Sequence, residues 1–164
     1  MSHKRRSYEA GHKAKFLVVI DNTPECDRAL YYASRRAGRV GVSVAMLRVI
    51  ETHDRGQQWL GVADIMRAEA HEEANAALDR AGARASSITG VMPERVIREG
   101  EKAEEILKLI EEDEDIAVLI LAASSGSEGP GPLVASLAKT AGTFPIPVAI
   151  VPGHLSDEDL DSMS

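Results

Sequence analysis

The chain has 164 residues, of which 44% are hydrophobic and 27% are charged, and its formal net charge is −7 at pH 7. This length and composition fit one globular domain whose core needs neither disulfides nor metals. The acidic charge disfavours nucleic acid as the main partner, because phosphate backbones are bound by clustered Lys and Arg. No apolar run approaches the roughly 18 residues of a membrane span. The N-terminus also lacks the apolar centre of a secretory signal, so we expect a cytoplasmic protein without membrane contact.

The single cysteine and the two ends of the chain carry further predictions. Cys26 is the only cysteine, so neither an internal disulfide nor a cysteine-based zinc site can form within one chain. We expect it to fill space near the start of a helix, with a reactive thiol as the minor alternative. Residues 1–14 are expected to form a basic flexible tail and residues 154–164 an acidic flexible tail. The domain between them, residues 15–153, shows no internal repeat or linker.

Short apolar runs alternate with helical patterns along the chain. The first run, FLVVI at 16–20, predicts a strand buried on both faces. Thr23 is the expected cap of a helix that starts at Pro24 and is stopped by Gly38 and Gly41. The later predicted elements are a strand at 42–50, a helix at 60–85, a strand at 95–99, a helix at 102–115, a strand at 116–123, a helix at 133–142 and a strand at 148–151.

This alternation predicts an open parallel α/β sheet, because each crossover is long enough to contain a helix. In such sheets ligands bind beyond the carboxyl ends of the strands, where the strand order reverses. Two loops are candidates, residues 20–23 and residues 124–136. Glycines in the second loop can let the backbone approach an anion, and Asp21 can accept hydrogen bonds from a ribose or an adenine amino group. The alternatives are a simple glycine-rich turn and a helix-entry aspartate.

The two loops and the layout of the chain resemble the universal stress protein family over residues 15–153. FLVVIDNTPECDRAL is similar to the opening strand, aspartate and first helix of the family, and MLRVIE to its second strand. VIREGEKAEEILKLIEEDEDIAVLILAASSGSEG resembles the third strand, third helix and glycine loop, and PIPVAIVP the last strand. The resemblance implies a Rossmann-like fold of the adenine nucleotide alpha hydrolase type, with strand order 3-2-1-4-5 and helices on both faces. It also implies a homodimer through the last strand, at Val148, Ala149, Ile150 and Val151, which would cover an apolar edge.

Nucleotide-binding members of the family carry Gly, two residues, Gly, nine residues, then Gly-Ser or Gly-Thr. Gly126 and Gly129 match the first half of this pattern. Counting nine residues after Gly129 places Lys139-Thr140 at the final Gly-Ser or Gly-Thr position of the pattern. Aligning the last strands instead places Val134-Ala135 at that position, with Ser136 one residue further on. We prefer the second alignment. The resemblance therefore assigns an ATP or related adenine-nucleotide site to Asp21, Asn22, Val49, Ala123, Ser124, Gly126, Gly129, Val134, Ala135 and Ser136.

The content of the glycine loop departs from the family pattern. Ala123 stands where a glycine is usual, and Glu128 adds a carboxylate to the loop. No Lys or Arg lies between residues 116 and 138, and Pro130 and Pro132 remove two backbone donors. A carboxylate about 4 Å from a phosphate would cost on the order of 1 to 4 kcal/mol. The loop thus has the position of a phosphate site and an altered content.

The remaining polar clusters predict no catalytic or metal site. His53-Asp54 and His71-Glu72 lack the spacing of a two-histidine helix motif, and Trp59 is expected to cover the sheet or a dimer contact. No nucleophile elbow or Walker loop is present, so an enzyme is the third hypothesis. The leading hypothesis is a dimeric stress-response protein with an altered nucleotide pocket that acts mainly through contacts with an unidentified protein partner. The rival is an ATP- or AMP-binding switch with at most slow hydrolysis.

Overall fold

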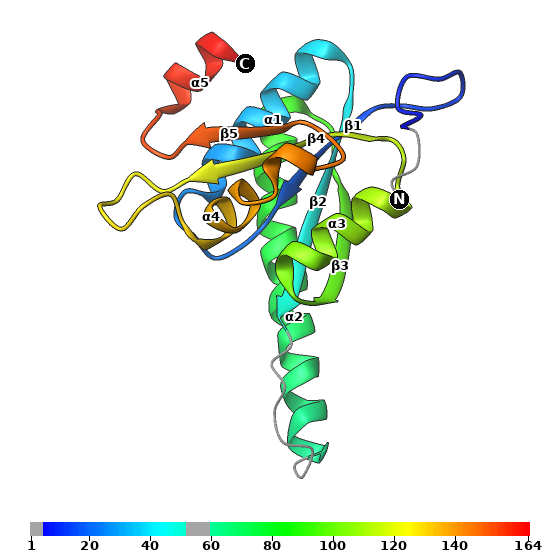
Figure 1. The fold of residues 1–164 in the computed structure, drawn as a ribbon, viewed down its shortest axis with the longest axis vertical. Helices are drawn as coiled ribbons and strands as arrows, with labels where there is room; N and C mark the ends of the chain where they lie inside the picture. Colours follow the sequence, from blue (N-terminus) through cyan, green and yellow to red (C-terminus); the bar gives the residue numbers. More distant parts are fainter. Residues whose placement is uncertain (1–4, 52–59) are drawn as a thin grey trace.

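The computed structural model describes residues 5–51 and 60–164, with only the backbone for residues 60–62. Five strands alternate with helices, and a further helix closes the chain (Figure 1). The elements are β1 Lys15–Val19, α1 Cys26–Val40, β2 Ser43–Glu51, α2 Leu60–Thr89, β3 Glu94–Gly100, α3 Lys102–Glu112, β4 Ile116–Ala123, α4 Pro132–Ala138, a 3-10 turn Ala141–Thr143, β5 Val148–Pro152 and α5 Asp157–Met163.

The strands form one parallel sheet in the order β3-β2-β1-β4-β5, which confirms the predicted order. β1 lies between β2 and β4, with Val18 opposite Met46 on one side and Ile120 on the other. The chain runs outward from β1 to β3 and then returns to β4, so the strand order reverses between β1 and β4. A ligand cleft is therefore expected at the carboxyl ends of these two strands.

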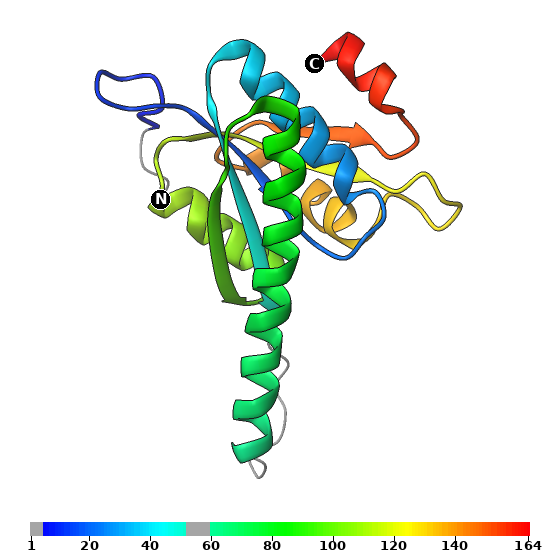
Figure 2. The same cartoon turned by 180° about the vertical axis from the view of Figure 1, so that it is seen from behind.

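Each face of the sheet carries its own apolar core, because alternate side chains of a strand point to opposite faces. Phe16 and Val18 of β1 pack under α1 and α2, with α5 beside them, whereas Leu17 and Val19 pack under α3 and α4. Figures 1 and 2 show these helix pairs from the two sides. Helices thus cover both faces, as predicted, and the N-terminal part of α2 extends beyond the sheet.

The start of α1 differs from its prediction. The N-cap is Glu25, which makes no side-chain capping bond, and not Thr23. The Thr23 hydroxyl instead donates to Asp21 Oδ1 at 2.5 Å, because the two residues form a tight turn after β1. At the other end Gly38 lies within the helix, contrary to its prediction, and Gly41 ends it as predicted, in the left-handed conformation with φ 77°.

A helix replaces the flexible tail predicted for residues 154–164. Ser156 and Asp159 form a capping box that starts α5, and Leu160 is fully buried in the core beside α1. Arg28 of α1 donates to the Leu155 carbonyl at 2.9 Å and pairs with Asp157 at 2.6 Å. The acidic segment is therefore held by apolar burial and by arginines of the domain.

The N-terminal segment is also held to the domain from Arg5 onward. The Arg5 guanidinium donates to the carbonyls of Ile110, Asp113 and Ile116 at 2.5 to 2.9 Å. These carbonyls lie at the end of α3 and the start of β4, where a cation is favoured by the helix dipole. Residues 5–14 thus contact the body where a flexible basic tail is predicted, while residues 1–4 lie outside the described part.

Candidate functional site

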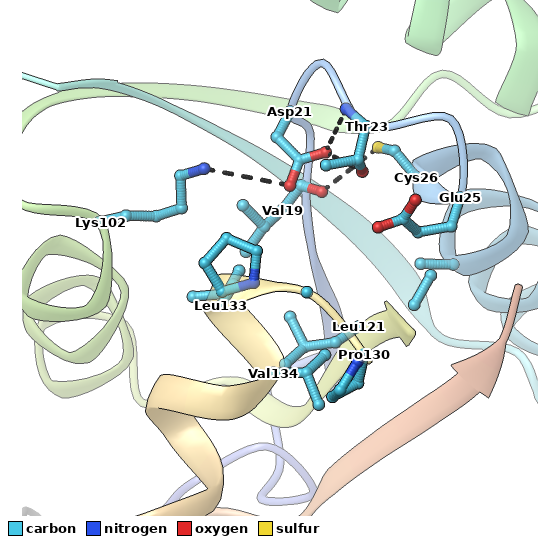
Figure 3. A pocket seen from close by; sticks show the side chains of 14 residues that line it. Val19, Asp21, Thr23, Glu25, Cys26, Lys102, Leu121, Pro130, Leu133 and Val134 are labelled. Carbon is cyan, nitrogen blue, oxygen red and sulfur yellow. Dashed lines mark hydrogen bonds and ion pairs between the residues drawn. The ribbon is translucent and has the colours of Figure 1, made fainter. Parts of the chain in front are cut away.

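The residues after β1 and after β4 meet at the reversal of strand order. Asp21 and Thr23 follow β1, and the segment from Pro130 to Val134 folds across them from the glycine loop (Figure 3). A cavity of about 50 Å³ remains between these two segments. Such a space holds a few water molecules and is far below the roughly 300–1,000 Å³ of ordinary ligand sites. We call this region the closed half of the cleft.

A larger hollow of about 490 Å³ adjoins the other side of Asp21. The carboxyl ends of β1 and β2 form its floor, and polar side chains from α2 and α3 stand around it. Its described lining includes Asp21, Asn22, Arg48, Val49, Glu73 and Lys102. We call this region the open half, and it contains the predicted residues Asp21, Asn22 and Val49.

Asp21 lies at the border of the two halves, and its two carboxylate oxygens have different surroundings. Oδ1 accepts from the Thr23 amide at 3.0 Å and from the Thr23 hydroxyl at 2.5 Å. Oδ2 faces the ammonium of Lys102, which is 4.0 Å away and lies 3.6 Å from Glu51 (Figure 3). Turn bonds therefore fix the carboxylate, and Oδ2 is the oxygen left to accept from a ligand.

Three backbone amides of the glycine loop, those of Ser124, Gly126 and Gly129, already have partners within the loop. The Ser124 amide donates to the Pro130 carbonyl at 3.0 Å, and the Gly126 amide to the Ser124 hydroxyl at 3.2 Å. The Gly129 amide donates to the Gly126 carbonyl at 3.4 Å, and the Ala135 amide to a carbonyl of its own helix turn. Because an amide offers one hydrogen, these groups are not free to hold a phosphate.

The structure brings only some of the predicted loop residues to the cleft. Val134 is buried and lines the closed half, whereas Ala135 is exposed. Ser136 faces a separate groove between α3 and α4, so its hydroxyl does not reach the cavity beside Asp21. The Ala123 carbonyl accepts from the Gly153 amide at 2.8 Å, which ties the end of β4 to the end of β5.

Three charged residues of the cleft, Lys102, Arg48 and Glu25, belong to no sequence motif that predicts a site. Lys102 supplies a cation from the first turn of α3, and Arg48 lies buried in β2, where it donates to Glu73 at 2.8 Å. Glu25 lines the closed half, while the predicted acidic residue Glu128 is exposed and lies outside its lining. A charged residue near the carboxyl end of an apolar strand, or at the start of the next helix, is the signal that could have identified Arg48 and Lys102.

Cys26 lies behind Asp21 with its thiol directed at the carbonyl of Val19, 3.5 Å away (Figure 3). Burial raises the pKa of the Cys26 thiol to about 11. A thiol with this pKa is almost entirely protonated near neutral pH, and the protonated form is a poor nucleophile. The geometry therefore favours the space-filling role over the reactive one.

The other polar clusters form no further site within the described residues. His71 Nε2 lies 3.2 Å from Glu99, which also pairs with Arg67, so this histidine belongs to a surface ion-pair cluster. No group of three potential metal ligands occurs among residues 5–51 and 60–164. His53, Asp54 and Trp59 lie outside the described residues. No helix in the described part of the chain is both long and apolar enough to span a bilayer.

Comparison with known proteins identifies the family. A sequence profile described as the universal stress protein family matches residues 14–152. The chain belongs to the universal stress protein family. The match includes all five strands and both halves of the cleft, and it leaves out helix α5. No curated protein sequence matches the chain.

Solved structures of other universal stress proteins share the fold of this one. A universal stress protein from Lactobacillus plantarum superimposes with a TM-score of 0.72 at 15% identity, covering 84% of this chain and 97% of that one. An Archaeoglobus fulgidus protein in complex with dAMP gives 0.58 at 19% identity, covering 84% and 97%. An Arabidopsis thaliana protein with AMP bound gives 0.58 at 18% identity, covering 88% and 94%. At these identities the likeness establishes the shared fold.

Proposed function

We propose that this universal stress protein is a cytoplasmic, dimeric stress-response protein that acts mainly through protein contacts and is not an enzyme. The observation that carries the proposal is the closed half of the cleft. Its cavity measures about 50 Å³, and the amides of Ser124, Gly126 and Gly129 bond within the loop. The cavity beside Asp21 is therefore too small for nucleotide phosphates, and three amides of the glycine loop already have partners.

The charges of the closed half support the same proposal. The carboxylates of Asp21 and Glu25 both line it, and Lys102 is the one cation in its lining. Two like charges about 4 Å apart repel by roughly 1 kcal/mol in water and by about 4 kcal/mol near a protein surface. A triphosphate placed between these carboxylates would meet this repulsion with one lysine to offset it.

The second candidate function is an adenine-nucleotide switch that uses the open half. The open half has room for an adenosine moiety, and Asp21 Oδ2 can accept from a ribose hydroxyl beside the strand end at Val49. Relatives solved with AMP and dAMP show that such ligands bind to other members of the fold. In this alternative Lys102 would hold a single phosphate outside the closed half.

Thermal unfolding with and without ATP and magnesium separates the two candidates. We expect no rise in melting temperature with ATP, because the phosphates have no site. A clear rise that is lost in Asp21→Ala and kept in Asp64→Ala would favour the switch and overturn the proposal. Asp64 suits the control because it is exposed, lies near the start of α2 and lines neither half of the cleft.

The dimer is proposed to form through β5, which lies at the edge of the sheet and pairs only with β4. Ile150 of this strand is a large apolar side chain that is 49% exposed. The outer backbone groups of an edge strand have no neighbouring strand to pair with. We expect sedimentation equilibrium to show a dimer that Ile150→Arg converts to monomer. The control Leu107→Arg, on the surface of α3, should remain dimeric. A monomeric wild-type protein would overturn this part of the proposal.

A further inference from the structure

Helix α5 covers part of the surface that α1 and α2 form on one face of the sheet. The family match ends at residue 152, before α5 begins at Asp157, so α5 is an addition to the matched domain. It packs against α1, and Figure 2 shows it beside α1 and away from the central strands. The side chains that bond to α5 come from α1 and α2. The surface under α5 therefore belongs to the family domain, and its cover does not.

Three arginines of this surface surround one aromatic ring. The guanidinium carbons of Arg28, Arg35 and Arg84 lie 5.6, 5.6 and 5.1 Å from the centre of the Tyr31 ring, within the range of cation–π contacts. Among the described residues outside α5, Asp27 is the one carboxylate paired with these arginines. We call the three arginines and the tyrosine the arginine surface. Without α5 it carries more positive than negative charge, so it favours an acidic counterpart.

Helix α5 meets the arginine surface with a short acidic pattern. Asp157 and Asp161 each pair with an arginine of the surface, at 2.6 and 2.9 Å. Asp161 also accepts from the Tyr31 hydroxyl at 2.6 Å. Leu160 is fully buried and lies on the same side of the helix as both aspartates, because residues three and four apart are neighbours on a helix. The arginine surface thus fits an acidic helix with one large apolar side chain.

Few of the contacts of α5 are of the kind that hold a helix firmly. It has seven residues, and an isolated helix of that length is not stable in water. Leu160 is the only buried residue within the helix. The side chains of Asp157 and Asp161 are 51% and 42% exposed, and exposed ion pairs add little stability. A segment of this kind opens at a low local cost, so another helix can compete with it for the arginine surface.

We propose that the arginine surface is a docking site for an acidic amphipathic helix of a protein partner, and that α5 masks this site in the free protein. The partner helix carries two carboxylates one turn apart and a leucine-like side chain beside them, as α5 does. The apolar position favours a protein helix over a nucleic acid, since phosphates can pair with arginines but leave the place of Leu160 empty. The proposal rests on the proposed action through protein contacts and names the chemistry of the partner.

Addition of an acidic peptide to the full chain tests the proposal. The probe is a synthetic peptide with the sequence of residues 154–164, HLSDEDLDSMS, and its binding is followed by amide shifts in an NMR spectrum. The host is the full chain with Asp157→Asn and Asp161→Asn, which weaken its own α5 and leave Leu160 in place. We expect saturable shifts at the arginine surface. The probe should bind this variant at least about fivefold more tightly than it binds the wild-type chain, whose α5 competes better.

Two controls separate the acidic pattern from general attraction. A probe with asparagine at both aspartate positions should bind at least about fivefold more weakly, because it lacks the two ion pairs. In the same host, Arg84→Gln should weaken binding at least about threefold, whereas Arg80→Gln should leave it unchanged. Arg80 is the matched control because it is exposed on α2, one turn before Arg84.

Four results would overturn the proposal. The probe gives no saturable shift at the arginine surface; it binds the wild-type chain as tightly as the variant; the asparagine probe binds as tightly as the acidic one; or Arg84→Gln binds the probe as tightly as Arg80→Gln does. None of these results changes the outcome of the ATP and dimer measurements, so the docking site can fail while the proposed function stands. Conversely, ATP binding that depends on Asp21 would overturn the proposed function without moving the affinity of the peptide.

Discussion

The two halves of the cleft share one aspartate and differ in what lies opposite it. On one side of Asp21 the segment from Pro130 to Val134 closes over the strand ends and leaves about 50 Å³. On the other side Arg48, Glu73 and Lys102 stand around a hollow of about 490 Å³. The strands beneath both halves belong to one parallel sheet, and the fold is shared with other universal stress proteins. The difference teaches that the conformation of one loop, and not the sheet beneath it, sets how much space each half offers a ligand.

The largest expected difference between the halves is in the reactivity of a thiol, that of Cys26, which lines the closed half. Burial raises the pKa of the Cys26 thiol to about 11, so alkylation by iodoacetamide at pH 8 should be about 100-fold slower than for an ordinary cysteine. The thiolate forms only as pH rises through the pKa, so the alkylation rate should increase steeply toward pH 11. Alkylation that is quenched at successive times and followed by mass spectrometry gives the rate at each pH.

The open half provides the matched control for this measurement. Asn22 is exposed and lines the open half, so Asn22→Cys in a Cys26→Ser background should react like a free thiol. Equal rates for Cys26 and the engineered cysteine would mean that the closed half opens readily. That result would remove the distinction between the halves.

The second prediction concerns the backbone that holds the closed half together. A Cβ added at Gly153 would lie 2.4 Å from the Ala123 carbonyl oxygen and 3.1 Å from Glu25 Cβ. We therefore expect Gly153→Ala to reduce the free energy of unfolding in urea by about 1–3 kcal/mol, as overpacking does. Gly142→Ala is the control, because its Cβ would meet nothing within 4 Å. Equal stabilities for the two variants would contradict the close contact of the ends of β4 and β5.

The third and smallest effect is expected in the open half. Arg48 is 8% exposed and donates to the Ile20 carbonyl at 3.2 Å and to Glu73 at 2.8 Å. Arg48→Met keeps much of the side-chain length and loses both bonds, so the free energy of unfolding should fall by about 1–2 kcal/mol. Arg67→Met removes an exposed pair with Glu99 and should cost less than about 1 kcal/mol. If Arg48→Met lowers the free energy of unfolding no more than Arg67→Met does, the bonds of Arg48 do not stabilise the open half.

Much of the fold can be predicted from local pattern. The apolar runs at residues 16–20 and 116–123 predict β1 and β4 because a parallel strand covered on both faces has few polar positions. The order of the strands is predicted by the family resemblance, since the alternation of strands and helices alone leaves the order open. Helix α5 differs from the flexible tail that the sequence predicts: Ser156 and Asp159 carry a capping-box signal, but the acidic composition around them is also typical of a flexible tail.

The site was less predictable because it depends on loop conformation. The position of Asp21 follows from the strand before it, and the prolines indicate a stiff loop. The closing of that loop onto β1 depends on hydrogen bonds between its own ends, such as Ser124 to Pro130, which no sequence spacing encodes. Lys102 reaches Asp21 from a helix that follows a strand two positions away in the sheet, so only the folded arrangement brings the charges together.

Equilibrium dialysis of one protein preparation with ATP and magnesium, and separately with adenosine, compares the two halves through the affinities of the two ligands. We propose that the closed half excludes phosphates while the open half has room for adenosine, so ATP should bind no more tightly than adenosine, and Asp21→Ala should weaken the binding of adenosine. ATP binding at least about tenfold tighter than adenosine, which corresponds to about 1.4 kcal/mol of phosphate contacts, would contradict the closed phosphate half.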